Sequence, residues 1–265
     1  TVQDYDSASL EIRLPVSNAA SQGRALVSTN SGKVYLCLIR ADGSAEYFNK
    51  PVPSNGKVTF TGMQAGSYAD ILVVHTTIDI VVNDVFGWME EEFDFSEQYR
   101  ESYKFYIESS LAAVIDGYGS IGWSGAKTLS PGSNNLGTLT LRPLCHTVEP
   151  LELDGVTLTI ANDTKLPRFY QLTLFDSFEK KEYQLSVEKV DGLSFELFDV
   201  AGKKIDGDES WVFNGDQYAI YLLVSGSLAK EENIVLSCKE YDSLPGYLEF
   251  ELLDNLNRDF LGKLG

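Results

Sequence analysis

Residues 57–74, KVTFTGMQAGSYADILVV, decide the fold of this chain. Val58 and Phe60 alternate with polar residues, as in a strand that buries one of its faces. A glycine-bounded turn is expected at 62–66, and an entirely apolar run follows at 71–74. A half-buried strand, a turn and a fully buried strand in this order are typical of an antiparallel β-sandwich.

The residues before this stretch continue the same pattern. The apolar run 34–39 leads into the Asp-Gly-Ser sequence at 42–44, where glycine supplies a positive φ without steric cost. A polar strand and an Asn-Gly turn at 55–56 then lead to residue 57. Residues 10–14 alternate up to Pro15 and predict a first strand, and 17–32 predict a long connection.

Length and composition predict two folded domains with a strongly acidic surface. The chain has 265 residues, 43% hydrophobic and 12% aromatic, which is enough for two cores of ordinary size. Thirty-nine acidic residues against 21 basic ones give a net charge of −18. Such a surface repels phosphate backbones, so nucleic acids and anionic membranes are disfavoured as partners.

No apolar run approaches the length of a transmembrane helix. The chain begins at Thr1 rather than Met, which predicts a trimmed N-terminus and is compatible with a lipid anchor that precedes residue 1. Of the three cysteines, Cys37 lies in an apolar strand and is expected to be buried. Cys145 and Cys238 are either one disulfide or two unrelated thiols.

An acidic and aromatic insertion is expected at residues 83–107. It holds either a short helix at 95–103 or a strand at 103–107, and the alternation of apolar residues in 103–107 favours the strand. Glycines within 117–125 predict a hairpin, and 136–141 predict the last strand of the first half.

The domain boundary is placed near residues 143–148, because Pro143 cannot donate to a strand ladder. The predicted domains are a first β-sandwich at 1–145 and a second, jelly-roll-like one at 146–265. The run 218–224 is almost continuously apolar, as in an inner strand buried on both faces. The tail 248–264 fits either a strand or a short helix. The other strands expected in the second half are 156–160, 169–175, 183–187, 193–200 and 234–238.

Two resemblances follow from these patterns. The segments VYLCLIRADGS, GKVTFTGMQAGSYADILVV and NNLGTLTLRP resemble the transthyretin-like or carboxypeptidase-regulatory-like sandwiches of secreted bacterial proteins, and fimbrillin-type surface proteins. The segments FYQLTLFDSFEKKEYQLSVEKVDGLSFELFDVAGKKI, GDQYAIYLLVSGS and ENIVLSC are similar to pre-peptidase C-terminal sandwiches. Both resemblances imply an exported bacterial protein, and neither carries catalytic residues to this chain.

Histidine-based catalysis is disfavoured, since the chain has only His75 and His146. His146 adjoins Cys145, but neighbours in sequence do not project toward each other as a nucleophile and its base must. The run of acids at 90–94 does not by itself supply the two opposed carboxylates of a glycosidase. We therefore expect no enzymatic activity.

Calcium is the one cofactor that the sequence leaves open. Asp206, Asp208 and Glu209 offer hard oxygen donors on one loop. The same residues are also common in plain hairpin turns, and we favour the turn.

A ligand site is expected among the aromatic residues that flank the insertion. Trp88, Tyr118 and Trp123 could stack on sugar rings while neighbouring acids accept hydroxyl hydrogen bonds. The alternative, favoured modestly, is that these rings cap the core. Trp211 is expected in the second core.

The sequence thus predicts an all-β protein of two tandem antiparallel β-sandwiches. The leading hypothesis for its function is a non-enzymatic role in binding, adhesion or assembly at the bacterial cell surface or in the periplasm. The expected partner is an extracellular glycan or protein. The alternatives are a carbohydrate-binding lipoprotein or accessory module, and a fimbria-like structural subunit whose strand edges accept a neighbour's strand.

Overall fold

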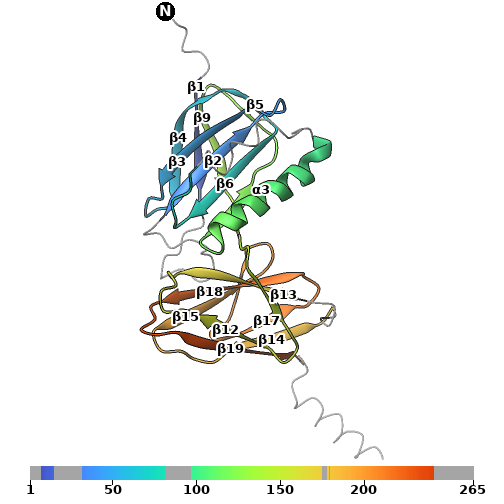
Figure 1. Ribbon diagram of the computed structural model, residues 1–265. Coiled ribbons are helices and arrows are strands. Elements are labelled where there is room, and N and C mark those ends of the chain that lie inside the picture. The colour runs from blue at the N-terminus through green and yellow to red at the C-terminus, as the bar shows by residue number, and fades with distance from the viewer. Residues whose placement is uncertain (1–6, 15–31, 82–96, 175–177, 179, 242–265) are drawn as a thin grey trace, which may run out of the picture.

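The computed structural model describes residues 7–14, 32–81, 97–174, 178 and 180–241 (Figure 1). These residues form an all-β structure with one α-helix. The elements of the N-terminal half are β1 (Ser7–Arg13), β2 (Lys33–Ile39), β3 (Ala45–Pro51), β4 (Lys57–Gln64), β5 (Gly66–Tyr68), β6 (Asp70–Thr76), the 3₁₀ turn η1 (Glu97–Tyr99), α3 (Arg100–Ile115), β7 (Gly119–Trp123), β8 (Lys127–Leu129), β9 (Gly132–Thr138) and β10 (Arg142–Pro143). Those of the C-terminal half are β11 (Val148–Leu151), β12 (Val156–Ile160), β13 (Arg168–Leu174), β14 (Glu182–Val187), β15 (Leu193–Phe198), β16 (Lys204–Ile205), β17 (Ser210–Asn214), β18 (Ala219–Gly226) and β19 (Glu232–Glu240).

Each half contains two main sheets. In the N-terminal half a three-stranded sheet, β4-β1-β9, faces the helix-backed sheet, β10-β7-β6-β2-β3, and β5 pairs with β8. In the C-terminal half the junction sheet, β11-β13-β18-β15-β16, faces the outer sheet, β12-β19-β14-β17. Every strand pair among the described residues joins strands on the same side of residue 145. The proposed division at 145/146 itself stays a prediction.

Two strand pairs depart from the expected antiparallel arrangement. β1 runs parallel to β9, and β11 runs parallel to β13, while the other pairs of neighbouring strands are antiparallel. In both cases a long stretch of chain separates the partners, so no tight hairpin dictates their direction.

The stretch 57–74 crosses from one sheet to the other. Its first part is β4, paired with β1 in the three-stranded sheet, and its last part is β6, in the centre of the helix-backed sheet. The turn expected at 62–66 is instead a β-bulge within β4, where the register to β1 shifts and Gly62 adopts a φ of 83°. A bulge that uses glycine bends a strand without ending it. The Asp-Gly-Ser turn is confirmed, with Asp42 accepting the Ser44 N–H at 2.9 Å.

The one α-helix of the described residues, α3, corrects the strand expected at 103–107. Tyr103, Ile107, Leu111 and Ile115 recur every four residues and are buried against the helix-backed sheet. Residues 103 and 107 lie on the same face of either a strand or a helix, so alternation over five residues does not separate the two. The helix also replaces the short one considered at 95–103. Residues 83–96 of the acidic insertion expected at 83–107 lie outside the described residues, as do most of 17–32 and all of 248–264.

The strands expected in the C-terminal half are confirmed, with β11, β16 and β17 in addition. β18 is the inner strand that its apolar run predicts, since it lies at the centre of the junction sheet and is buried on both faces. Its Tyr221, with Phe169 and Phe198 of neighbouring strands, belongs to the hydrophobic core of the N-terminal half. The junction sheet therefore packs against the N-terminal half (Figure 1).

Candidate binding surface around helix α3 and the junction

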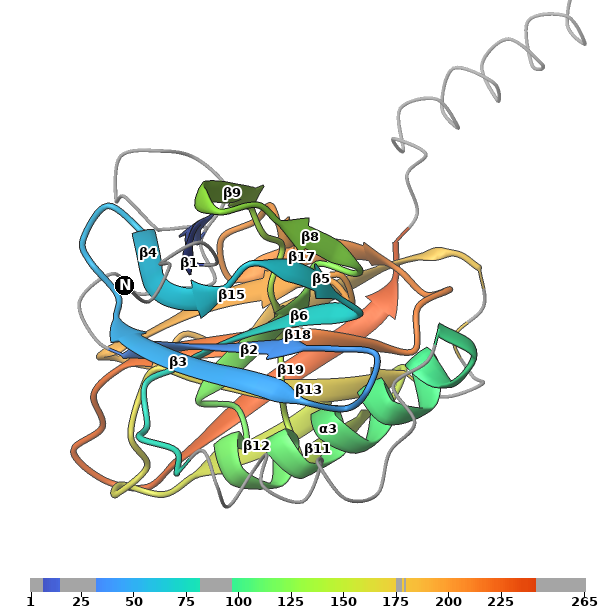
Figure 2. The same ribbon diagram turned by 90° about the horizontal axis from the view of Figure 1, so that it is seen from above.

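The helix α3 carries a pair of exposed aromatic side chains that we name the aromatic face, Phe105 and Tyr106. Phe105 is 66% exposed and Tyr106 is 53% exposed, and their rings contact each other edge to face at 5.8 Å. Figure 2 shows α3 at one side of the molecule. Exposed apolar patches on folded proteins commonly mark interaction sites.

A buried carboxylate fixes α3 to the sheet beneath it. Asp70, at the start of β6, is fully buried and accepts hydrogen bonds from Arg100 Nε at 2.7 Å and Tyr103 Oη at 3.2 Å. Its other oxygen accepts the Gly125 N–H at 2.9 Å. The hydrogen bond to Asp70 raises the pKa of Arg100, and burial together with the Asp70 charge raises the pKa of Tyr103. These contacts fix the position of the first turn of α3.

Trp123, one of the predicted ligand residues, contacts α3 with both its ring and its N–H group. Its Nε1 donates to Glu108 at 2.8 Å, and the Lys104 ammonium lies 5.2 Å from the ring centre. The Tyr103 ring packs beside it at 6.2 Å. The half-buried indole thus contributes to the packing of α3, which is the capping role that the sequence also allowed.

Tyr118 lies at the other end of β7, at the junction of the two halves. The Arg168 guanidinium stacks 5.3 Å from its ring centre. Tyr118 lines a cavity of about 510 Å³ together with Thr77, Ile78, Asp79, Lys165, Leu166 and Pro167. Tyr118 and Trp123 are five residue steps apart along the extended chain, or roughly 16 Å, so the two rings do not share one site. Trp88 lies outside the described residues.

The two halves are joined by a compact set of polar contacts around Asp116, the residue that ends α3. Asp116 adopts a left-handed φ of 37° and accepts the backbone N–H groups of His146 and Thr147 at 3.0 and 2.9 Å. Its other oxygen accepts Arg168 Nη2 at 2.7 Å. Burial opposes ionisation of Asp116, but the hydrogen bonds from Thr147 and His146 and the Arg168 charge outweigh it and lower the pKa.

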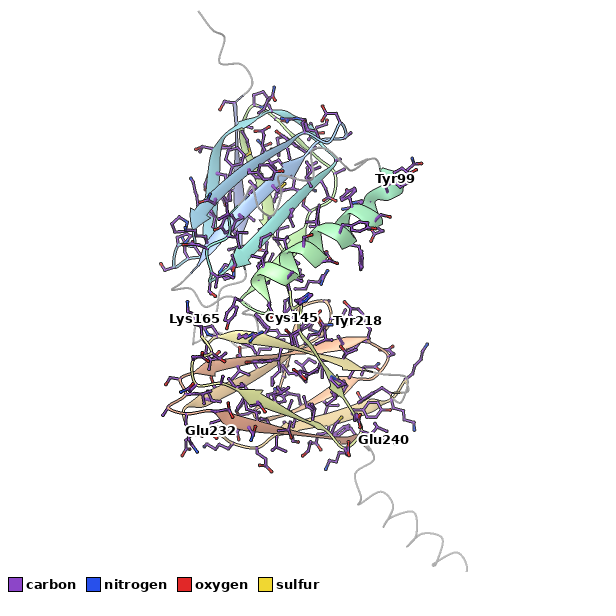
Figure 3. The ribbon with its side chains drawn as sticks, viewed as in Figure 1. Tyr99, Cys145, Lys165, Tyr218, Glu232 and Glu240 are labelled. Atoms are coloured by element: carbon purple, nitrogen blue, oxygen red, sulfur yellow. The ribbon has the colours of Figure 1, made fainter. Side chains whose placement is uncertain are left out.

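A groove opens on the same junction, between α3 and the junction sheet. Its cavity measures about 240 Å³. Figure 3 shows Tyr218 and Cys145 at this place, below α3. The lining residues are Phe105, Glu108, Ser109, Ala112, Arg142, Pro143, Leu144, Cys145, Gln171, Tyr218 and Tyr221.

Sequence reasoning misses the two exposed rings of this groove, Phe105 and Tyr218. The apolar run 218–224 places Tyr218 in a buried strand, but β18 begins one residue later and the ring is 57% exposed. The alternation in 103–107 places Phe105 in a strand, whereas in α3 it projects away from the buried positions 103 and 107. A four-residue period through 103–115 is the signal that could have found the helix.

The predicted metal loop has the form of a turn. Asp206 and Asp208 are exposed, Gly207 bridges to Trp211, and Glu209 has a φ of 59°. Within the described residues there is no group of three or more His, Cys, Asp or Glu side chains that could hold a metal ion. Calcium binding stays an untested alternative to the turn.

The three cysteines are free thiols, which answers the question of a Cys145–Cys238 bridge. Cys37 is buried as expected, and Trp211 is buried in the second core. Burial raises the pKa of Cys145 to about 12, so this thiol is protonated at neutral pH. His75 is buried in β6, whereas His146 is exposed at the junction.

The geometry defines an all-β, multi-sheet protein with a helix-borne apolar surface. No family model matches the chain. No curated protein matches it either. The resemblances to transthyretin-like, fimbrillin-type and pre-peptidase C-terminal domains therefore stay predictions.

Two solved structures show low similarity. One is the fimbrial anchor protein Mfa2 from Porphyromonas gingivalis, at 9% identity and a TM-score of 0.27, with 87% of this chain and 77% of that chain covered. The other is a structure of infectious bursal disease virus, Gx strain, at 10% identity and a TM-score of 0.12, with 91% and 73% covered. At these TM-scores neither superposition supports a conclusion about function. None of the helices in the described part is long and apolar enough to cross a membrane.

Proposed function

We propose that this chain is a non-enzymatic protein of the bacterial cell envelope, exported to the surface or the periplasm, which binds another protein through the aromatic face of α3. The observation that carries the proposal is the aromatic face itself. Two of the nine exposed large apolar side chains among the described residues, Phe105 and Tyr106, contact each other on α3. An isolated exposed apolar residue is ordinary, whereas exposed apolar side chains in mutual contact mark a candidate docking surface.

The chemistry of the partner follows from the charge around this face. Glu101 is exposed on the first turn of α3, next to the aromatic face, and the whole chain carries a net charge of −18. Two copies that met through this face would bring their Glu101 carboxylates together, and like charges repel, so a second copy of this chain is disfavoured as the partner of this face. A partner segment with apolar residues flanked by Lys or Arg fits this surface best.

Photo-cross-linking tests the docking surface. We would place p-benzoylphenylalanine at Tyr106 and, as a matched control, at Tyr241, an exposed tyrosine of the C-terminal half. In cells that make the full-length protein, we expect a discrete cross-linked species from position 106 only, and Tyr106→Ala with Phe105→Ala should abolish co-purification of that partner. Equal cross-linking from both positions, or a native protein found in the cytosolic fraction, would contradict the proposal.

Assembly by strand addition is a second candidate, and the edge strand β9 favours it. β9 is the last strand of the three-stranded sheet, and its sequence GSNNLGT contains no charge and no proline. The edge strand β3 of the other sheet instead carries Lys50 and Pro51, residues that discourage strand addition. In light scattering over a concentration series, the average particle mass of the wild-type chain should increase with concentration. That of the Leu136→Lys variant should stay constant. Scattering that does not depend on concentration would exclude this form of assembly.

A further inference from the structure

The groove between α3 and the junction sheet combines exposed rings with converging polar groups. Phe105 enters its lining from α3, and Tyr218 enters from the loop before β18. The two rings therefore come from two different halves of the molecule, and both are more than half exposed. Figure 3 places Tyr218 directly below the helix.

An ion pair supplies the polar groups of the lining. Arg142 Nη2 donates to Glu108 Oε2, and Glu108 Oε1 accepts the Trp123 indole N–H at 2.8 Å. Each carboxylate oxygen can accept a second hydrogen bond, and a guanidinium has five N–H donors. Gln171 adds an amide to the same lining. The groove thus presents both acceptors and donors beside flat apolar faces.

We infer that this groove is a binding site for a neutral sugar residue. A pyranose ring offers C–H faces for Phe105 and Tyr218 and hydroxyl groups for Glu108, Arg142 and Gln171, which is the combination that the groove displays. The position differs from the Trp88 and Trp123 site expected from the sequence, because the faces of Trp123 pack on α3.

The charge around the groove and the volume of its cavity restrict the kind of sugar further. Arg142 is already neutralised by Glu108, and the acidic chain repels anions, so uronic and sialic acids are disfavoured. The cavity of about 240 Å³ is smaller than the roughly 300–1,000 Å³ of sites that enclose drug-sized ligands. It therefore suits one sugar ring of a longer glycan.

The test is a titration of the whole chain with methyl glycosides of glucose, galactose, mannose and N-acetylglucosamine, followed by saturation-transfer NMR and calorimetry. We expect at least one to bind with a millimolar Kd. Tyr218→Ala and Phe105→Ala should each weaken that binding about tenfold, which corresponds to about 1.4 kcal/mol. Tyr218→Phe should retain it, because the ring face is kept.

Tyr241→Ala is the matched control, since Tyr241 is an exposed tyrosine of the C-terminal half that does not line the groove. It should leave sugar binding unchanged. The sugar titration needs no protein partner, so this proposal and the proposed function fail separately. Circular dichroism confirms that each variant is folded. Three outcomes would overturn the sugar site: no binding up to about 10 mM, equal binding by Tyr218→Ala and Phe105→Ala, or equal binding of methyl glucuronide.

Discussion

The two halves of the molecule solve the same packing problem in different ways. Each contains a sheet whose central strand is apolar on both faces: β6 in the helix-backed sheet and β18 in the junction sheet. In the N-terminal half the second face is covered by α3, which creates a separate core. In the C-terminal half the second face is covered by the N-terminal half itself. A continuous apolar strand thus predicts that a cover exists, but it does not predict which element supplies it.

We expect the largest loss of stability from a mutation in the core where the N-terminal half covers the junction sheet. Phe198 is fully buried and contacts Phe169 edge to face at 5.7 Å, within the core that both halves share. Phe198→Ala should lower the free energy of unfolding by about 3–5 kcal/mol. Hydrogen exchange should then speed up in strands of both halves. Phe213→Ala, in the core of the C-terminal half alone, is the control and should affect only that half.

The helical cover should be nearly as important. Leu111 lies on the inner side of α3 and is fully buried. Leu111→Ala should therefore lower the free energy of unfolding by about 2–5 kcal/mol, because contacts are lost and a cavity is left. Amide hydrogen exchange should become faster in β2 and β6, whereas the amides of β14 and β19 should exchange as slowly as in the wild-type chain. Uniform acceleration in both halves would show that the two covers are not independent.

The anchor of the helix should have an intermediate effect. Asp70→Asn removes the charge that Arg100 and Tyr103 hydrogen-bond, and hydrogen bonds to charged groups contribute about 1.5–3 kcal/mol. We expect a loss of that size in urea denaturation. Arg100→Gln should reproduce most of it, and the double variant should lose less than the sum because the residues act as a pair.

The smallest effect is expected at the polar junction, as a function of pH. The pKa of Asp116 is lowered in the folded state, so its contribution is fully present above its unfolded value of about 3.9 and is lost as pH falls through the folded value. As the pH falls below about 5, the wild-type chain should lose up to about 1 kcal/mol more stability than Asp116→Asn. Identical acid profiles would show that Asp116 does not contribute to the stability of the junction.

Most of the fold could be predicted from the sequence because strands leave local patterns of apolar residues. The alternation in 10–14 and 57–60 and the apolar runs at 34–39 and 71–74 all mark strands that the structure contains. The helix was missed because only two of its four inward positions fall within 103–107, and positions 111 and 115 would have separated a helical period from a strand. The direction of β9 relative to β1 could not be derived, since nothing local fixes the pairing of distant strands.

The candidate surfaces were harder to predict than the strands. The sequence predicts a site at aromatic residues, but whether a ring is packed or exposed depends on contacts from distant parts of the chain. Trp123 is engaged by Lys104 and Glu108 across α3, whereas Tyr218 is exposed because β18 begins one residue later than its apolar run suggests. Such differences follow from tertiary packing and leave no trace in residue type.

The position of β1 has a mechanical consequence. β1 lies between β4 and β9, and it begins at the end of the molecule farthest from the C-terminal half (Figure 1). A pull at Ser7 directed away from that half acts along the strand, so it loads the hydrogen bonds to both neighbours in shear. They must then break together instead of one after another. Tension along the long axis would therefore meet its resistance in this three-stranded sheet, whereas a sideways pull would unzip it.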